Sequence, residues 1–487
     1  MILIILGVSL ECYPQRGGRT RRPVRLPSLP VSTASRKKVY PKHVTGRFHS
    51  LRAVTSTCLQ ALLFLVPWLQ WHGQQAVLLD LAGRRVFLFG QVIFPQETYF
   101  LHLMLITAAI TLFASTALVG RVWCGYACPQ TLFTQSFLMV ERLIEGDRAR
   151  RMLIDRGPWN REKIQKKLAK HSVWLGMALW LGFTFSGYFV PIRQLAADLL
   201  SGHVSSTTAS IVTFFTAVSL FEFGWFREQF CNFLCPYARF QGAMMDRQSL
   251  IISYDPARGE PRGKVGSAPR GHCVDCSLCV QVCPQGIDIR KGLQLECIAC
   301  AACIDVCDQV MDKVGHPRGL VRYSSLDQLE GLPRKSLLRP RVIAYAVIWT
   351  ALVSTFLYLA THRPLVGLDV NRATPGGSTV YSVAADGRIC NIYKLRLVNH
   401  TCDPQVVSLS LAAPQGGSLV SPAQLKQAEL VSPSNPITLE PAQAFEGQFL
   451  VLFPRQGLPL CQTFQLRVDV GGQSYQRSTT FLYSGPR

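Results

Sequence analysis

The sequence predicts a multi-domain membrane protein with an α-helical transmembrane bundle of about five spans, a cysteine-rich cytoplasmic insert and a C-terminal all-β sandwich. Three observations lead to this fold class. Apolar stretches of about twenty residues, the length that crosses a bilayer, recur along the chain. Eight cysteines are concentrated between Cys273 and Cys307, and the last part of the chain alternates polar and apolar residues in short runs.

Composition supports a membrane location. Of the 487 residues, 48% are hydrophobic and only 16% are charged, which is unlike a soluble globular chain. The formal net charge is +22, and the positive residues lie in blocks beside apolar stretches. Because the positive-inside rule produces such blocks, nucleic-acid binding is the weaker interpretation, and we expect no nucleic acid among the partners.

Residues 1–52 are predicted to form a basic, disordered cytoplasmic tail. Eleven Lys or Arg residues, with Pro and Ser between them, lie from Arg16 to Arg52. Met1 to Leu10 are apolar but lack a preceding basic segment, so they are not typical of a secretory signal. A mis-assigned translation start or a frayed tail is the favoured interpretation of that stretch.

The next region, 53–250, is predicted to hold four spans, and a fifth helix is predicted at 339–361. The loop from Arg121 to Lys170 holds eleven Lys or Arg, whereas the loop around Arg193 holds one. The first loop is therefore expected in the cytoplasm and the second outside. By the same rule the linker and cysteine-rich domain at 251–338 are cytoplasmic, and residues 362–487 are extracytoplasmic. The expected spans are 53–71, 100–118, 173–192, 209–226 and 342–360, with a re-entrant or strand-like turn between the first two.

The cysteine-rich segment repeats the spacing C-x-x-C-x-x-C-x-x-x-C twice. Each iron of a [4Fe-4S] cluster needs one thiolate, and in two-cluster ferredoxins three come from one run and the fourth crosses over from the other. Zinc favours two C-x-x-C pairs, and a disulfide framework needs an oxidising compartment. The segment is therefore predicted to be a ferredoxin-like insert with two [4Fe-4S] clusters. The predicted ligands are Cys273, Cys276, Cys279 and Cys307 for one cluster, and Cys297, Cys300, Cys303 and Cys283 for the other.

A second motif, C-x-x-x-C-P, closes each of the first two hairpins of apolar spans, at Cys124 and Cys128 and again at Cys231 and Cys235. On a helix, positions i and i+4 share a face, so each pair would present two thiols side by side. Four such thiols could bind Cu(I), relay electrons or hold a further cluster. Alternatively they are packing residues at helix ends that a proline terminates. The repetition at matching positions favours a function.

The C-terminal region, 362–487, is predicted to be an immunoglobulin-like β-sandwich. Runs such as Tyr393–Val398 and Phe464–Val470 alternate in polarity and are separated by turn residues. Its three cysteines are an odd number, so at most one disulfide forms within the domain. The choice of pair among Cys390, Cys402 and Cys461 stays open.

The motifs VYPKHVTGRF, WCGYACPQ, FCNFLCPYARFQ and ECIACAACIDVCDQVM resemble those of the FixG/RdxA/CcoG family of cytochrome c oxidase accessory proteins, and the resemblance extends over nearly the whole chain from about Lys37. It implies a multi-pass protein of the bacterial inner membrane with cytoplasmic clusters and a periplasmic C-terminal domain. The family's cluster ligands fall on the eight cysteines named above, and its membrane thiols on Cys124, Cys128, Cys231 and Cys235. Cys390 stands where the family tends to have a basic residue, which puts a disulfide with Cys402 or Cys461 in play.

The resemblance also implies a function: maturation of the cbb-type cytochrome c oxidase by reduction of Cu(II) to Cu(I), a cupric reductase activity that would make the chain an oxidoreductase. The expected partners are the lipid bilayer, oxidase subunits or copper-delivery proteins and an unidentified cytoplasmic electron donor, with a homodimer left open. Two alternatives are a redox sensor or assembly scaffold, and a quinone-linked membrane electron-transfer subunit. Cu(II) reduction by the purified protein would distinguish the first function from a scaffold.

Overall fold

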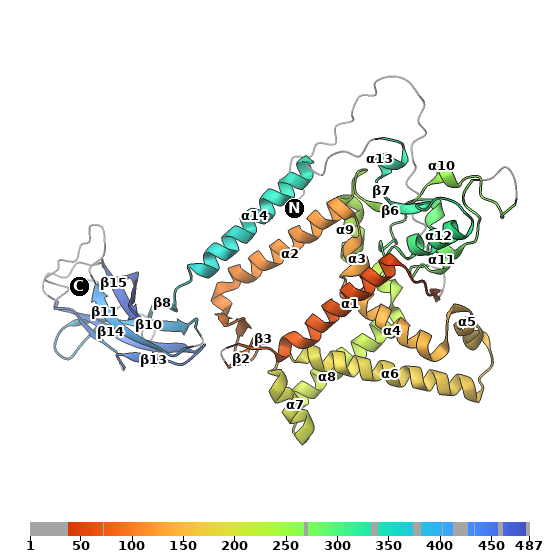
Figure 1. The fold of residues 1–487 in the computed structure, drawn as a ribbon. Coiled ribbons are helices and arrows are strands. Elements are labelled where there is room, and N and C mark those ends of the chain that lie inside the picture. Colours follow the sequence, from red (N-terminus) through yellow and green to blue (C-terminus); the bar gives the residue numbers. More distant parts are fainter. Residues whose placement is uncertain are drawn as a thin grey trace. The chain divides into compact units, whose positions relative to one another are not determined.

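The computed structural model describes most of the chain (Figure 1). Contacts within the chain divide it into two units, Met1–Val39 and Tyr40–Arg487. The predicted apolar start and most of the predicted basic tail lie outside the described residues. Those residues are 38–71, 73–266, 271–332, 339–373, 381–401, 403–412, 427–432, 434–455 and 461–483.

The structure differs from the predicted disordered tail over residues 40–52. The hydroxyl of Tyr40 donates to Asp155 at 2.6 Å, and Arg151 donates to the carbonyl oxygen of Pro41 at 2.6 Å. The first span helix then begins at Arg47. The tail prediction treated these residues as solvated because of their charge, but the hydroxyl of Tyr40 and the backbone carbonyl of Pro41 have partners on other parts of the chain.

Four helical segments of the described chain are long and apolar enough to cross a membrane, and they match the first, second, fourth and fifth predicted spans. Large side chains such as Leu101, Leu105 and Ile106 on the second are exposed, as expected where lipid is the solvent. The helices of the second and fifth predicted spans pack together, and Trp349 of the fifth donates to the hydroxyl of Thr111 of the second at 3.0 Å. The segments are α1 (Arg47–Leu65) with η1 (Val66–Trp68), α2 (Thr98–Val119), α8 (Ser206–Ser219) with η3 (Leu220–Phe226), and α14 (Pro340–Thr361).

The third predicted span, 173–192, falls in helix α6 (Arg161–Ser186), which packs against α8 and α4 (Pro129–Glu145). Its first turns carry several charged residues, among them Lys163 and Lys170, so its apolar part is shorter than that of the other four. The helix ends at Ser186, before the predicted boundary. Its crossing of a membrane stays a prediction.

Short elements connect the long helices. The segment between the first two spans is a three-stranded antiparallel sheet, β3-β4-β5, which agrees with the strand-like alternative of that prediction. Its strands are β3 (Val77–Asp80), β4 (Arg85–Leu88) and β5 (Gln91–Ile93), and a small hairpin of β1 (Gln70–Trp71) and β2 (Gln74–Gln75) precedes them, with η2 (Pro95–Glu97) after them. The remaining connecting helices are α3 (Val122–Tyr126), α5 (Arg148–Arg156), α7 (Ile192–Ser201), η4 (Phe230–Leu234) and α9 (Pro236–Met244).

The cysteine-rich domain is closed by one antiparallel strand pair, β6 (Ile251–Tyr254) with β7 (Val321–Ser324). The predicted linker at the start of the region 251–338 therefore begins inside a strand, and Tyr254 packs in the core of this domain. Between the two strands lie α10 (Pro256–Gly259), α11 (Leu278–Gln281), η5 (Ile289–Lys291) and α12 (Ala302–Lys313), and α13 (Leu326–Leu329) follows.

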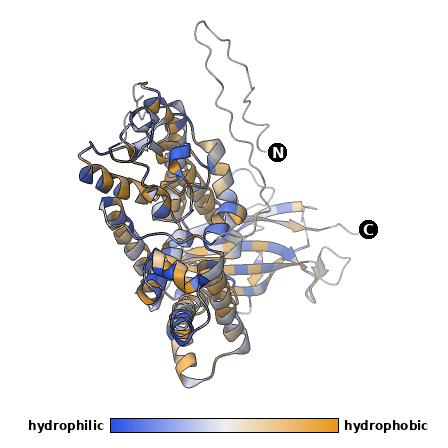
Figure 2. Ribbon diagram, turned by 90° about the vertical axis from the view of Figure 1, so that its right-hand side faces the viewer, coloured by the Kyte–Doolittle hydropathy of each residue, from blue (hydrophilic) through white to orange (hydrophobic). Residues whose placement is uncertain are grey.

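The C-terminal part is a sandwich of two antiparallel sheets, ordered β12-β14-β10-β8 and β13-β11-β15-β16, with β9 paired to β10. Figure 2 shows the alternation of hydrophilic and hydrophobic residues along its strands. In the core Tyr393 stacks on Phe449 and meets Phe464 of the other sheet edge-on. Cys390 and Cys461 are both free, and Cys402 lies outside the described residues. The strands are β8 (Val366–Ala373), β9 (Ser382–Val383), β10 (Ile389–Asn399), β11 (Gln405–Ala412), β12 (Glu429–Val431), β13 (Ile437–Leu439), β14 (Ala444–Phe453), β15 (Cys461–Val470) and β16 (Gln473–Leu482).

Candidate iron-sulfur and thiol site

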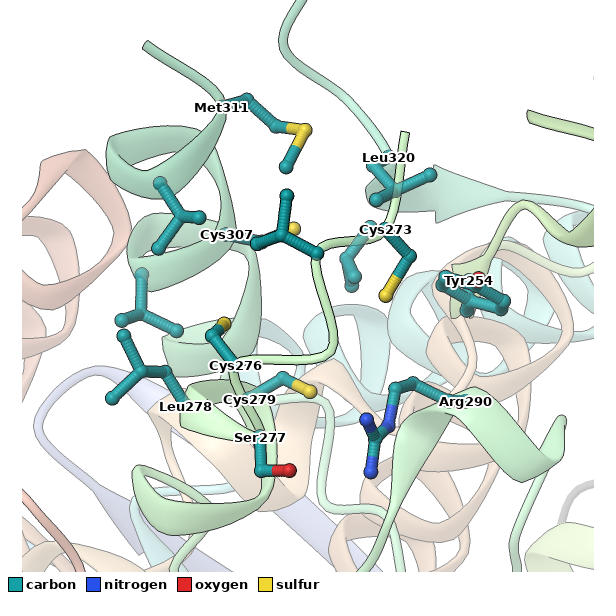
Figure 3. A pocket seen from close by; sticks show the side chains of 14 residues that line it. Tyr254, Cys273, Cys276, Ser277, Leu278, Cys279, Arg290, Cys307, Met311 and Leu320 are labelled. Carbon is teal, nitrogen blue, oxygen red and sulfur yellow. The ribbon is translucent and has the colours of Figure 1, made fainter. Parts of the chain in front are cut away.

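The eight cysteines of the cysteine-rich domain line two cavities. Figure 3 shows the first, with side chains from the loop before α11 and from α12 around it. Cys279 borders both cavities. The grouping is the one that the crossover rule predicts, and the role of these residues as ligands stays a prediction. Cys273, Cys276, Cys279 and Cys307 line the first cavity, and Cys283, Cys297, Cys300 and Cys303 line the second.

The positions of the cysteines on and beside helices α11 and α12 explain the crossover. Cys303 and Cys307 lie four residues apart on α12, and therefore on one face of it. Cys303 borders the second cavity, and Cys307 borders the first cavity. Cys279, in α11, and Cys283, just after it, have the same spacing and likewise reach both cavities. Each of these two pairs of cysteines thus supplies one thiol to the first cavity and one to the second cavity.

Both cysteine loops have the same unusual backbone. The residues on either side of the middle cysteine have positive φ angles: 52° at Asp275 and 54° at Ser277 in the first loop, and 53° at Ala299 and 59° at Ala301 in the second. Positive φ is uncommon outside glycine and is found at sites where the surrounding structure enforces it. Sequence reasoning missed these positions because none of the four residues is a glycine.

Burial weakens the acidity of several of these thiols. It raises the pKa of Cys279 and of Cys297 to about 11 and the pKa of Cys307 to about 12, because a thiolate loses its hydration in the domain interior. A bound metal reverses this balance, since a coordinating thiol is deprotonated. Within the described ranges no three His, Cys, Asp or Glu side chains surround a position for one ion. A cubane does not need such a position, because each of its irons takes a separate thiolate.

The prediction that each C-x-x-x-C-P motif lies on one helix face is wrong. Cys124 lies in α3, but Cys128 has extended φ and ψ of −67° and 124° and caps the following helix, α4. Cys231 lies in η4, and Cys235, at −69° and 111°, caps α9. The proline after each second cysteine is the physical reason, because the residue before a proline avoids the helical region.

The four motif cysteines nevertheless come together. Burial is the main cause that raises the pKa of Cys124 to about 11 and that of Cys231 to about 12, and neighbouring thiols add to it: Cys128 and Cys235 act on both of them. The thiol of Cys124 also meets the amide oxygen of Gln241, on α9, at 3.5 Å. We call Cys124, Cys128, Cys231 and Cys235 the four-thiol group.

The four-thiol group lies beside the second cysteine cavity. Cys124 and Cys300 belong to one buried apolar cluster, together with Ile298. A Cβ atom on Gly125 would come within 2.6 Å of the carbonyl oxygen of Ile298. The backbone of α3 is therefore in direct contact with the cysteine loop 297–303, and only a glycine permits this approach.

Two charged residues that sequence reasoning did not select hold this arrangement together. Arg121 is 6% exposed, and its guanidinium donates to the carbonyl oxygens of Leu295 and Ala238. Asp305, on α12, accepts from the backbone N–H groups of Phe48 and His49. Neither residue carries a sequence signal of its own, because an isolated Arg or Asp in these segments is also typical of a solvated surface.

Three family models match the chain. Residues 226–326 match the 4Fe-4S dicluster domain, and residues 101–144 match a 4Fe-4S binding domain. Residues 356–484 match the IG-like fold at the C-terminal of FixG. The first of these ranges contains all eight predicted cluster ligands, and the second contains Cys124 and Cys128.

Relatives extend over most of the chain. Protein RdxA from Cereibacter sphaeroides is 41% identical over 384 residues, which are 75% of this chain and 80% of the relative. Nitrogen fixation protein FixG from Rhizobium meliloti is 37% identical over 418 residues, 77% of this chain and 79% of the relative. The crystal structure of a FixG-related protein from Vibrio parahaemolyticus matches 24% of this chain and 96% of its own, at 16% identity and a TM-score of 0.20. The identities to RdxA and FixG confirm the resemblance seen in the motifs, and the chain belongs to the FixG/RdxA family of iron-sulfur proteins.

Proposed function

We propose that this chain is a membrane-bound electron-transfer protein that reduces Cu(II) to Cu(I) and so supports maturation of a cbb-type cytochrome c oxidase. The observation that carries the proposal is the contact between Gly125 and the loop of Cys297 to Cys303. Because of this contact the second cavity lies next to the four-thiol group, so electron transfer between them would need no domain movement.

The proposed ligands of the clusters are the two cavity-lining sets of four cysteines. The paired loops, their matching positive-φ residues and the donor set of thiols fit two [4Fe-4S] groups. When bound, these groups would supply one-electron carriers. The cysteine-rich domain would hold them out of water, and an unidentified cytoplasmic donor would supply the electrons.

Copper enters this proposal as the substrate. Cu(II) takes one electron to become Cu(I), and thiol ligands favour the softer Cu(I). Loss of hydration raises the pKa of Cys124 to about 11 and that of Cys231 to about 12, so both thiols are protonated at neutral pH. Binding of Cu(I) would release those protons. The four side chains are not arranged as a single-ion site within the described residues, so binding is expected to draw them together.

The experiment that tests the proposal compares two cysteine variants. In chemically reduced, purified protein the double change Cys124→Ser and Cys128→Ser is expected to abolish stoichiometric Cu(II) reduction while iron content and cluster absorption stay unchanged. Cys58→Ser, an exposed cysteine on α1, is the matched control and should keep full activity. Full activity in the double variant would show that these thiols are packing residues.

A second candidate is a third iron-sulfur cluster held by the four-thiol group. The observation that favours it is the match of residues 101–144 to a 4Fe-4S binding domain, because the cysteines in that range are Cys124 and Cys128. The iron count decides between the two candidates. About eight irons per chain support a copper-binding thiol group, and about twelve support the third cluster.

The proposed location is the bacterial inner membrane, with the cysteine-rich domain in the cytoplasm and the β-sandwich in the periplasm. The positive-inside distribution of Lys and Arg supports this orientation, and four apolar helices are compatible with it. Oxidase subunits or copper-delivery proteins would then meet the periplasmic side. Binding of such a partner without any copper reduction would favour an assembly scaffold.

A further inference from the structure

Arg121 is a buried cation that forms no ion pair with an Asp or Glu side chain among the described residues. Its side chain is 6% exposed, its Nη atoms donate to the carbonyl oxygens of Leu295 and Ala238, and its Nε has no partner. Among the described residues no Asp or Glu forms an ion pair with it. A charge removed from water is costly unless an opposite charge compensates it, so the residue requires an explanation.

The surroundings of Arg121 supply that explanation. Its backbone carbonyl accepts from the N–H of Cys124 at 3.0 Å, at the start of α3. Leu295, which it contacts, lies two residues before Cys297 of the second cavity. Burial is the largest influence on the pKa of Cys124, Cys231 and Cys297, and the charge of Arg121 opposes it at all three thiols. One guanidinium thus faces both the four-thiol group and the second cavity.

We propose that Arg121 is a positioning residue that fixes the four-thiol group against the second cysteine cavity and supplies the positive charge that stabilises an electron there. The inference rests on the proposed function in one respect, namely that the second cavity holds a cluster. Thiolate ligation gives such a centre a negative charge, and one further electron increases it. A cation beside it favours the reduced form, because opposite charges attract strongly where water is excluded.

The hydrogen bonds add a geometric role. Ala238 lies on α9, after the second motif, while Leu295 lies in the cysteine-rich domain. Arg121 therefore links both motifs to the loop that carries Cys297. A planar guanidinium suits this task because it directs several N–H donors in fixed directions, whereas a lysine ammonium acts as a compact point charge.

The test is an EPR-monitored redox titration of the full-length protein with a chemical reductant and no copper. In Arg121→Gln the ratio of reduced to oxidised second-cavity cluster at a fixed potential should fall about tenfold, which is about 59 mV for a one-electron couple. The first-cavity cluster should not change, and Cys300→Ser assigns the signals. Lys291→Gln removes an exposed positive charge from the same domain and should leave both potentials unchanged.

A second variant keeps the proposal testable if Arg121→Gln does not assemble its clusters. Arg121→Lys keeps a positive charge at this position and loses the planar set of N–H donors. The potential of the second-cavity cluster should then stay nearer to that of the parent protein than the shift of about 59 mV expected for Arg121→Gln, and the potential of the first-cavity cluster should not change.

Equal shifts in the reduction potentials of both clusters in Arg121→Gln, or no shift in either potential, would overturn the role of Arg121. So would a potential of the second-cavity cluster in Arg121→Lys that falls as far as the shift expected for Arg121→Gln, because the positive charge is retained there. Failure of the proposed function looks different. In that case the parent protein does not reduce Cu(II), although replacement of Arg121 still changes the potential of the second-cavity cluster.

Discussion

The carboxylate of Asp305 accepts a hydrogen bond of 2.8 Å from the backbone N–H of His49. Asp305 lies between Cys303 and Cys307 on α12, and His49 lies in the first turn of α1. The first four N–H groups of a helix lack partners within the helix, so this carboxylate acts as a cap supplied from another part of the chain. The start of the first span is therefore anchored to the helix that serves both cysteine cavities.

Replacement of Asp305 should loosen this anchor. Asp305→Ala leaves the two partly buried N–H groups of Phe48 and His49 without their charged acceptor, and it should lower stability by about 1.5–3 kcal/mol. Thermal unfolding of the purified protein measures the change. Asp312→Asn is the matched control, because Asp312 lies on the same helix but is exposed, and its carboxylate pairs with the exposed Arg318 at 2.7 Å. Equal stability of Asp305→Ala and the parent would show that the cap contributes nothing.

The close approach at Gly125 leads to a prediction about the rate of copper reduction. In Gly125→Ala the added methyl group would meet the Ile298 carbonyl at 2.6 Å, so α3 and the cysteine loop must separate. Such overpacking costs about 1–3 kcal/mol, and copper reduction should slow while the iron content persists. Gly176→Ala, at a helical position with no atom within 4 Å, is the control and should retain the parent rate. An unchanged rate in Gly125→Ala would contradict the proposed route.

The crossover grouping predicts the effect of losing one ligand. Cys300 lines the second cavity and does not line the first. Cys300→Ser should therefore lose about four of about eight irons per chain and leave the other cluster largely intact. Iron and acid-labile sulfide analysis of anaerobically prepared protein measures this. Zinc without sulfide in the parent protein would remove the basis of both cluster sites.

The orientation in the membrane can be tested with introduced thiols. A cysteine at Arg156 should react with a membrane-impermeant reagent only from the cytoplasmic side, and one at Ser434 only from the opposite side. Cys461 is exposed in the same domain as Ser434, so the test uses a Cys461→Ser background. Labelling of Ser434→Cys from the cytoplasm would reverse the orientation of the last span.

Several features of this protein could be predicted from local sequence alone, because each depends on a short-range physical requirement. A [4Fe-4S] group needs one thiolate per iron, so the spacing from Cys273 to Cys307 predicts which cysteines line which cavity. A bilayer needs about twenty apolar residues, so hydropathy locates α1, α2, α8 and α14. The alternation of side chains likewise predicts the strands of the sandwich.

The tertiary structure decided what depends on contacts between distant segments. The helical period predicted one face for Cys124 and Cys128, but Pro129 keeps Cys128 out of the helical conformation, and the thiols meet through the packing of two hairpins. The contact of Gly125 with Ile298 and the buried position of Arg121 join residues more than 170 positions apart. A local pattern carries no information about such contacts, because they are determined by which surfaces remain to be buried after the helices and loops have formed.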